Sequence, residues 1–244
     1  MITELSRLSQ LTENKLTLLA KTLADSGFQF SAITDEIRTV IKGMDAVTAG
    51  KASVWYFEAN AFAGELAAKQ NVSIEIAAGI ISAVSPRMPW LRNKRVADTI
   101  LGEFRKYGNL SAIDAAKEIG MALSANVALA VRIARGEDIA NVLTGIKRQS
   151  FYNNIVSPNN GDSVTVDTWM INSIVRAYGV SKKDAEKFIR ANEKAMGGTG
   201  VGYFLIAESV RNVATEMGMH AHQIQSLYWV ALSGDHNGGR TDVS

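Results

Sequence analysis

Two side chains in this sequence stand out as candidates for chemistry, the carboxylate of Asp167 and the amine of Lys147, which lies 20 positions earlier. Asp167 follows a short β-branched run, residues 164–166 (VTV), and a segment with helical spacing begins at it. A carboxylate in the first turn of a helix either caps backbone N–H groups or supplies a fixed charge for catalysis, and one side chain can do both. Twenty positions allow one helix and a reversing loop. We therefore expect the helices that begin at Lys147 and Asp167 to bring their N-termini together.

Conventional catalytic and metal sites are not expected. His220 and His222 are two residues apart, a spacing that points side chains to different faces of a helix, and His236 lies in the tail. No HExxH, GxSxG or Ser-His-Asp pattern occurs. GGTGVG at 197–202 does not follow a strand, so we interpret it as a flexible linker and not as a phosphate-binding loop. The sequence thus predicts no metal and no cofactor.

The composition is that of an ordinary globular chain, with 47% hydrophobic and 20% charged residues. The formal net charge of +2 excludes a strong global attraction to nucleic acid or anionic membranes, so such binding would need a local patch. There are no cysteines, the first ten residues lack the order of a signal peptide, and no apolar run is long enough to cross a bilayer. We expect a cytoplasmic protein without membrane contact.

The sequence predicts an all-α fold, because alanine is abundant, prolines number only three and apolar residues recur at helical spacing. We expect one compact multi-helix domain over residues 1–232 and a flexible tail over 233–244. The sequence leaves open whether this domain has two lobes with a cleft. Gln223 and Gln225 are interpreted as surface residues. The helices are expected at 12–25, 31–43, 51–70, 73–84, 93–107, 111–118, 124–135, 138–143, 146–156, 167–178, 182–196, 203–217 and 222–232.

The order of parts over residues 72–180 resembles a known superfamily. An apolar helix with a broken end (IISAVSPR) is followed by NKRVADTILGEF, by ANVALAVRIAR, by the hairpin-like LTGIKRQSFYNN, and by V-D-T at a helix start. This looks like the helix-hairpin-helix DNA glycosylases related to endonuclease III. The strings SPRxxWxxN and GxKxxxFxxN also resemble uncharacterised phage-borne proteins of this type, for which the compartment would be the host cytoplasm.

The resemblance implies a base-excision enzyme that acts on double-stranded DNA and cleaves the N-glycosidic bond of a flipped-out base. The catalytic aspartate of the family would fall on Asp167, where a carboxylate stabilises the positive charge that develops on the sugar. The hairpin lysine would fall on Lys147, whose amine can attack C1′ and add AP-lyase activity. A flipped base leaves a gap in the stack that a side chain must fill.

The resemblance also implies which residues contact DNA. The broken helix end would supply the wedge, and cations would hold phosphates. The sequence departs from the family in two places: Leu143 stands where the hairpin has its first glycine, and Trp169 stands where V-D-T is usually followed by His. The predicted DNA-binding residues are Gly145, Arg148, Arg87, Arg92, Lys94 and Arg95, with Arg176 as a further candidate, and the predicted wedge or base-pocket residues are Val84, Ser85, Trp90 and Trp169.

Other interpretations remain open at this point. Lys147 can be a solvated lysine, and Trp90 and Trp169 can be core anchors. The chain can be a non-catalytic helical module, again of phage type, that binds DNA or a protein; the degenerate hairpin and near-neutral charge favour this. A third alternative is an enzyme on free nucleosides that uses the same carboxylate. A protein partner or a second copy of the chain is left open, and the sequence does not identify the target base.

Overall fold

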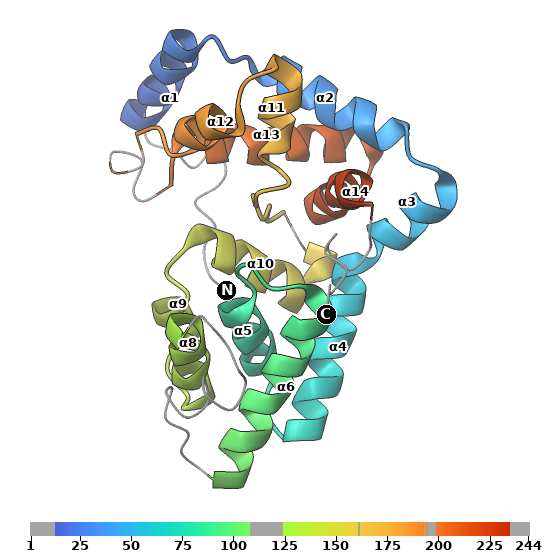
Figure 1. The fold of residues 1–244 in the computed structure, drawn as a ribbon, viewed down its shortest axis with the longest axis vertical. Helices are drawn as coiled ribbons and strands as arrows, with labels where there is room; N and C mark the ends of the chain where they lie inside the picture. The colour runs from blue at the N-terminus through green and yellow to red at the C-terminus, as the bar shows by residue number, and fades with distance from the viewer. Residues whose placement is uncertain (1–12, 108–123, 161, 193, 195–198, 235–244) are drawn as a thin grey trace. The chain divides into compact units, whose positions relative to one another are not determined.

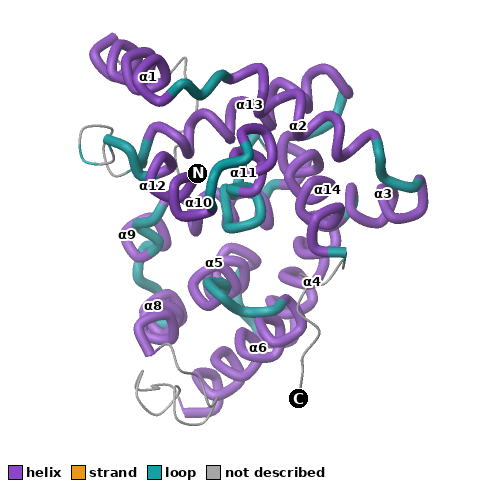
Figure 2. The backbone as a smooth tube through the Cα atoms, turned by 45° about the horizontal axis from the view of Figure 1, so that its top comes forward, coloured by secondary structure: helices purple, strands orange, loops and turns teal. Residues whose placement is uncertain are grey.

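The structure, a computed structural model, describes residues 13–107, 124–160, 162–192, 194 and 199–234. The all-α prediction is confirmed, since these residues form helices joined by loops and no strand (Figure 2). The predicted helix at 111–118 and nearly all of the predicted tail lie outside the described residues. Among the helices that are described, none combines the length and apolar character that crossing a bilayer requires.

The helices group into two compact units. The first unit combines the segment that ends at Trp55 with the segment that begins at Asn159, and the second unit runs from Tyr56 to Pro158. The stretch of the family resemblance, 72–180, therefore runs across both units. The described α-helices of the first unit are α1 (Glu13–Ser26), α2 (Phe30–Lys42), α3 (Ala46–Ser53), α11 (Asn172–Tyr178), α12 (Lys182–Ile189), α13 (Val201–Met217) and α14 (Ala221–Ser233) (Figure 1).

The core of the first unit is built around α13, which packs against α2, α12 and α14. Its sequence VGYFLIAESVRNVA is buried at nearly every position, and α14 adds contacts to α2 and α3. α11 packs against α2 and α12 and ends at Gly179, whose φ of 62° is the left-handed conformation that favours glycine. Polar side chains on α13 are thus enclosed by helices and need partners inside the unit.

The second unit is built around α5 (Ile74–Val84), which packs against α6, α8 and α10 (Figure 1). The prediction of a buried apolar helix is confirmed, because every residue from Ala77 to Val84 is buried. Ser73 starts this helix by accepting a hydrogen bond from the Ile76 N–H. The other helices of the unit are α4 (Trp55–Gln70), α6 (Trp90–Tyr107), α8 (Ser124–Ala134), α9 (Ile139–Val142) and α10 (Ile146–Val156).

Several predicted boundaries are wrong. The single helix expected at 51–70 is two helices, α3 and α4, separated at Val54. α6 starts at Trp90 and not at Asn93. Pro89, directly before it, has no N–H group, but the N–H groups at the start of a helix make no bond within the helix, so the proline does not prevent the helix from starting here. The helix expected from Asp167 begins at Asn172. α12 ends at Ile189, several residues before the predicted end.

Gly200 and Gly202 are packing residues and not part of a simple linker, which corrects the interpretation of GGTGVG over its described part. A Cβ on Gly200 would lie 1.9 Å from the Ile189 carbonyl oxygen, and a Cβ on Gly202 would lie 2.6 Å from the Ile189 Cα. The Val201 N–H donates to the Ala191 carbonyl at 2.9 Å. The two glycines therefore let the start of α13 approach the end of α12 closely.

Candidate functional site

The extended segment that leads to Asp167 is held in place by side chains of α13 and α14. The Tyr203 hydroxyl donates to the Val164 carbonyl at 2.8 Å and accepts from the Val166 N–H at 3.3 Å. The Gln225 Oε1 accepts from the Thr165 N–H at 3.0 Å. Residues 163–166 are all buried. The backbone before Asp167 is thus fixed by specific bonds, as a positioned catalytic group requires.

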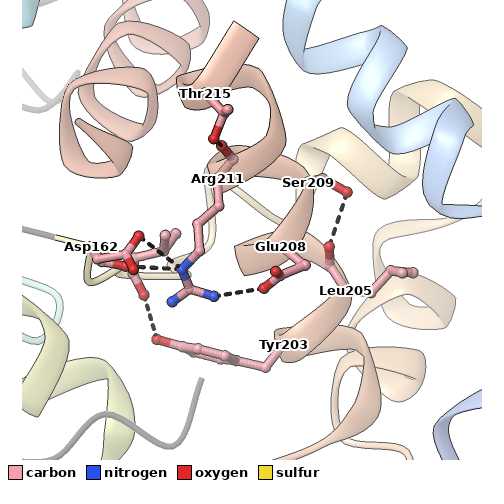
Figure 3. Close-up of polar contacts among 8 residues, drawn as sticks. Asp162, Tyr203, Leu205, Glu208, Ser209, Arg211 and Thr215 are labelled. Atoms are coloured by element: carbon pink, nitrogen blue, oxygen red, sulfur yellow. Dashed lines mark hydrogen bonds and ion pairs between the residues drawn. The ribbon is translucent and has the colours of Figure 1, made fainter. Parts of the chain in front are cut away.

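Arg211 fixes the start of the same segment (Figure 3). Its Nε donates to the Asp162 carbonyl at 3.0 Å and lies 3.4 Å from Asp162 Oδ1, while its Nη1 donates to Glu208 Oε2 at 2.9 Å. The Arg211 side chain is only 9% exposed. A buried guanidinium is stable only when it is paired and hydrogen-bonded, so these contacts couple the loop to α13.

Tyr203 and Tyr228 provide a matched pair of tests for this arrangement. Tyr203→Phe leaves a buried N–H and a buried carbonyl without their partner, so we expect a loss of about 1–3 kcal/mol in the free energy of unfolding. Tyr228 is fully buried in the same unit, burial raises its pKa, and its hydroxyl has no hydrogen bond within the described residues. Tyr228→Phe should leave stability unchanged or slightly higher. Denaturant unfolding of both variants checks this, and equal losses would contradict it.

Asp167 caps a turn that leads into α11. Its Oδ1 accepts hydrogen bonds from the Trp169 N–H at 2.9 Å and from the Met170 N–H at 3.0 Å. The capping interpretation is therefore confirmed, although the cap serves a turn and the α-helix starts at Asn172. Asp167 and Trp169 are half-buried, while Met170 is buried. Within the described residues, no side-chain cation bonds the carboxylate, so its charge is not neutralised by an ion pair there.

Lys147 lies in the other unit, in the first turn of α10, where its side chain is half-buried. Residues 143–145 connect α9 to α10, and Gly145 is the N-cap with φ −88° and ψ 128°. A Cβ on Gly145 would meet nothing within 4 Å, so neither conformation nor packing requires glycine there. Because Lys147 and Asp167 belong to different units, their pairing in one site stays a prediction.

Arg148 is bonded inside the second unit. Its Nη2 donates to Asn126 Oδ1 at 2.8 Å, its Nε is buried without a hydrogen-bond partner in the described part, and burial lowers the pKa of its guanidinium. A half-buried cation without a carboxylate would gain from an anion. This is compatible with phosphate binding, and the prediction for Arg148 stands untested.

The corner between α5 and α6 contains the predicted wedge. Val84 is fully buried, so in this structure it packs in the core and is not available as a wedge. The Ser85 Oγ donates to the Ser82 carbonyl at 3.0 Å. Arg87 is the exposed side chain of the corner, in a turn closed by the Met88 N–H donating to the Ser85 carbonyl at 3.1 Å. Its φ of 62° is left-handed, a conformation that is strained for arginine.

The strain at Arg87 gives a second test. Arg87→Gly removes a left-handed penalty of about 1–2 kcal/mol, part of which the greater freedom of glycine in the unfolded chain offsets. We expect the variant to be more stable by about 0.5–1 kcal/mol, measured as a higher denaturant midpoint. If Arg87 also contacts DNA, the affinity of the protein for DNA should fall in the same variant. A less stable variant would show that the arginine side chain contributes contacts that outweigh the strain.

The remaining predicted contacts lie at the start of α6. Arg92 and Arg95 are exposed. Lys94 Nζ lies 5.3 Å from the centre of the Phe62 ring and 5.7 Å from that of Trp90. The two rings are themselves 6.0 Å apart in an edge arrangement, and Trp90 is half-buried. Lys94 and Trp90 therefore belong to an aromatic–cation cluster, which holds both side chains in one orientation.

Two predictions about polar residues of the first unit are wrong. The rings of His220 and His222 stack with centroids 5.4 Å apart, because His220 is the N-cap of α14 with an extended backbone and helical spacing does not apply to it. Gln225 is buried at 4% exposure and bonds the segment before Asp167.

The described residues contain no group of three or more His, Asp or Glu side chains that could hold a metal ion. Arg176, the further phosphate candidate, is ion-paired with Glu36.

Comparison with known proteins adds a family but no activity. No curated protein and no solved structure matches the chain. A family model, described as a family of unknown function (DUF7178), matches residues 20–236. This match spans most of the 244 residues, including both units and the Asp167 turn. The chain therefore belongs to the DUF7178 family of unknown function.

Proposed function

We propose that this protein is a DNA N-glycosylase-like enzyme in which Asp167 is the essential carboxylate. The observation that supports this most is the position of Asp167, half-exposed at the end of a segment that Tyr203, Gln225 and Arg211 hold in place. Such support fixes the backbone from which the carboxylate projects, as a positioned catalytic group requires. A fixed anion beside an anomeric carbon stabilises the oxocarbenium-like transition state of N-glycosidic cleavage.

Lys147 would determine whether the enzyme is also a lyase. An unprotonated amine at C1′ forms a Schiff base with the sugar after the base has left, and borohydride reduces this intermediate to a stable protein–DNA adduct. We expect Lys147→Gln to abolish the adduct while base release through Asp167 continues. If the wild-type protein releases a base but gives no adduct, the enzyme is monofunctional and Lys147 has another role.

The proposal is tested by incubating the chain with duplexes that each carry one altered base: uracil, an alkylated base, an oxidised base or a hypermodified pyrimidine. Alkali then cleaves any abasic site, and the shortened strand is resolved on a gel. We expect cleavage of at least one duplex after alkali and none of an unmodified control. The absence of cleavage with every duplex would count against a glycosylase.

The second candidate is a non-catalytic helical module. It is favoured by the hydrogen bonds of Asp167, whose Oδ1 is fully used in capping, and by the inward bond of Arg148 to Asn126. A module would bind DNA in a salt-sensitive way, or bind a protein, and would leave no abasic product. Activity on free nucleosides but not on duplexes would instead identify the third alternative, a nucleoside-cleaving enzyme.

A further inference from the structure

Three exposed cations form a line along α12 and its C-cap residue, outside all of the sites described above. Lys183, Lys187 and Arg190 follow one another at spacings of four and three residues, and all three are exposed. Side chains at these spacings lie on one face of a helix, with neighbouring Cβ atoms about 5–6 Å apart. We call this set the α12 ridge. It carries three positive charges on a chain whose formal net charge is +2.

Within the described residues, the α12 ridge lacks the carboxylate partners that Arg38 and Arg211 of the same unit have. Arg38 of α2 donates to Glu216 at 2.8 Å, and Arg211 of α13 donates to Glu208 at 2.9 Å. In the part of the chain that the structure describes, no ion pair or hydrogen bond involves the three ridge side chains. No described carboxylate therefore neutralises these three charges.

The carboxylates next to the ridge do not neutralise it in the described contacts. Asp184 accepts from the Ser181 hydroxyl at 2.6 Å and belongs to the cap of α12. Glu186 is half-buried. Glu193 lies outside the described residues. Residues 182–190 hold four cations (Lys182, Lys183, Lys187 and Arg190) and two carboxylates (Asp184 and Glu186), so this stretch keeps a net positive charge.

The opposite face of α12 holds the helix to its unit. Ala185 and Phe188 are buried, and the Phe188 ring lies 4.4 Å from the Phe28 ring, centre to centre. Because the apolar face is used inside the unit, α12 does not offer the exposed apolar surface that membrane-bound amphipathic helices insert into lipid. A regular row of cations without such a surface fits a polyanion with regularly spaced charges.

We propose that the α12 ridge binds the phosphodiester backbone of nucleic acid. α12 packs against α11, the helix that follows the Asp167 turn, so the ridge and the candidate carboxylate lie in one unit. Contacts of this kind are independent of base sequence and weaken steeply with salt. The proposal extends the proposed function and does not require Asp167 to be catalytic.

The test compares two triple variants of the full chain, Lys183→Gln/Lys187→Gln/Arg190→Gln and Lys21→Gln/Lys42→Gln/Lys51→Gln. The control lysines are also exposed but lie on three different helices, α1, α2 and α3, and both variants change the formal net charge from +2 to −1. Binding to a fluorescent unmodified 30-base-pair duplex is followed by anisotropy at increasing salt. The ridge variant should lose about tenfold or more in affinity at low salt, and its log–log salt slope should fall by about 2–3.

The control variant should lose far less affinity and keep a slope near the wild-type value. Equal losses of affinity in both variants would show that binding depends only on net charge and would overturn the proposal. Unchanged binding by the ridge variant would overturn it as well. Ridge-dependent binding to vesicles containing phosphatidylserine, without binding to DNA, would also overturn it. Anisotropy with the unmodified duplex measures the ridge, whereas base release from the altered duplexes measures the chemistry at Asp167, so a failure of the chemistry and a failure of the ridge are distinguishable.

Discussion

Asp167→Asn should reduce base release by about 10²–10³-fold or more while the protein stays folded. The substitution removes the negative charge that would stabilise the sugar cation. It preserves an amide oxygen that can still accept hydrogen bonds from the Trp169 and Met170 N–H groups, and Asn and Asp are about equally good caps. The measurement is the single-turnover rate on whichever altered duplex the wild type cleaves, with the unfolding midpoint recorded in parallel.

Asp167→Ala separates the two roles of this residue. It removes the charge and the cap together, so it should show the same loss of activity as Asp167→Asn and a further loss of about 1 kcal/mol in stability. If Asp167→Asn retains wild-type activity, the carboxylate acts only as a cap. If both variants unfold, the activity of Tyr203→Phe shows whether disrupting the segment before Asp167 is enough by itself to abolish base release.

Gly202→Ala should destabilise the first unit by at least about 2 kcal/mol, among the larger effects of a single methyl group. The added Cβ would lie 2.6 Å from the Ile189 Cα and 2.9 Å from the Ile189 nitrogen, and these are backbone atoms that cannot move without shifting α12. The gain in helix propensity of about 1 kcal/mol is too small to offset this. Thermal unfolding should show a midpoint lowered by about 4–8 °C.

Gly64→Ala is the matched control, since Gly64 also lies inside a helix. Its added Cβ would be 4.0 Å from the Ile74 Cδ1, an ordinary contact. The variant should gain about 0.5–1 kcal/mol because alanine is the better helix former. A stable Gly202→Ala protein would show that the start of α13 does not need its close approach to α12.

Features that depend on neighbouring residues could be predicted from the sequence. The α5 helix follows from a serine cap, a mainly apolar run after Glu75 and the proline after it. Asp167 as a cap follows from the residue types on either side of it. Both depend on interactions within one turn, which residue order determines directly.

Features that depend on distant residues could not be predicted. Tyr203 and Gln225 meet the segment before Asp167 from 37 and 60 positions away, and no local pattern joins them. Arg211 within the apolar run of α13 is a sequence signal that indicates a buried partner, because a buried arginine needs one. Predicting the stacking of His220 on His222 requires knowing the exact residue at which α14 starts. Predicting the role of Gly200 and Gly202 requires knowing that α12 ends close beside them.

The most direct test of the central claim is mass-spectrometric detection of the free base released from the altered duplexes by the wild type and by Asp167→Asn side by side. The account predicts that the wild type liberates an intact base from at least one duplex and that the Asn variant, folded and still bound to DNA, liberates almost none. Release of the same base at the same rate by both proteins, or by neither, would contradict it.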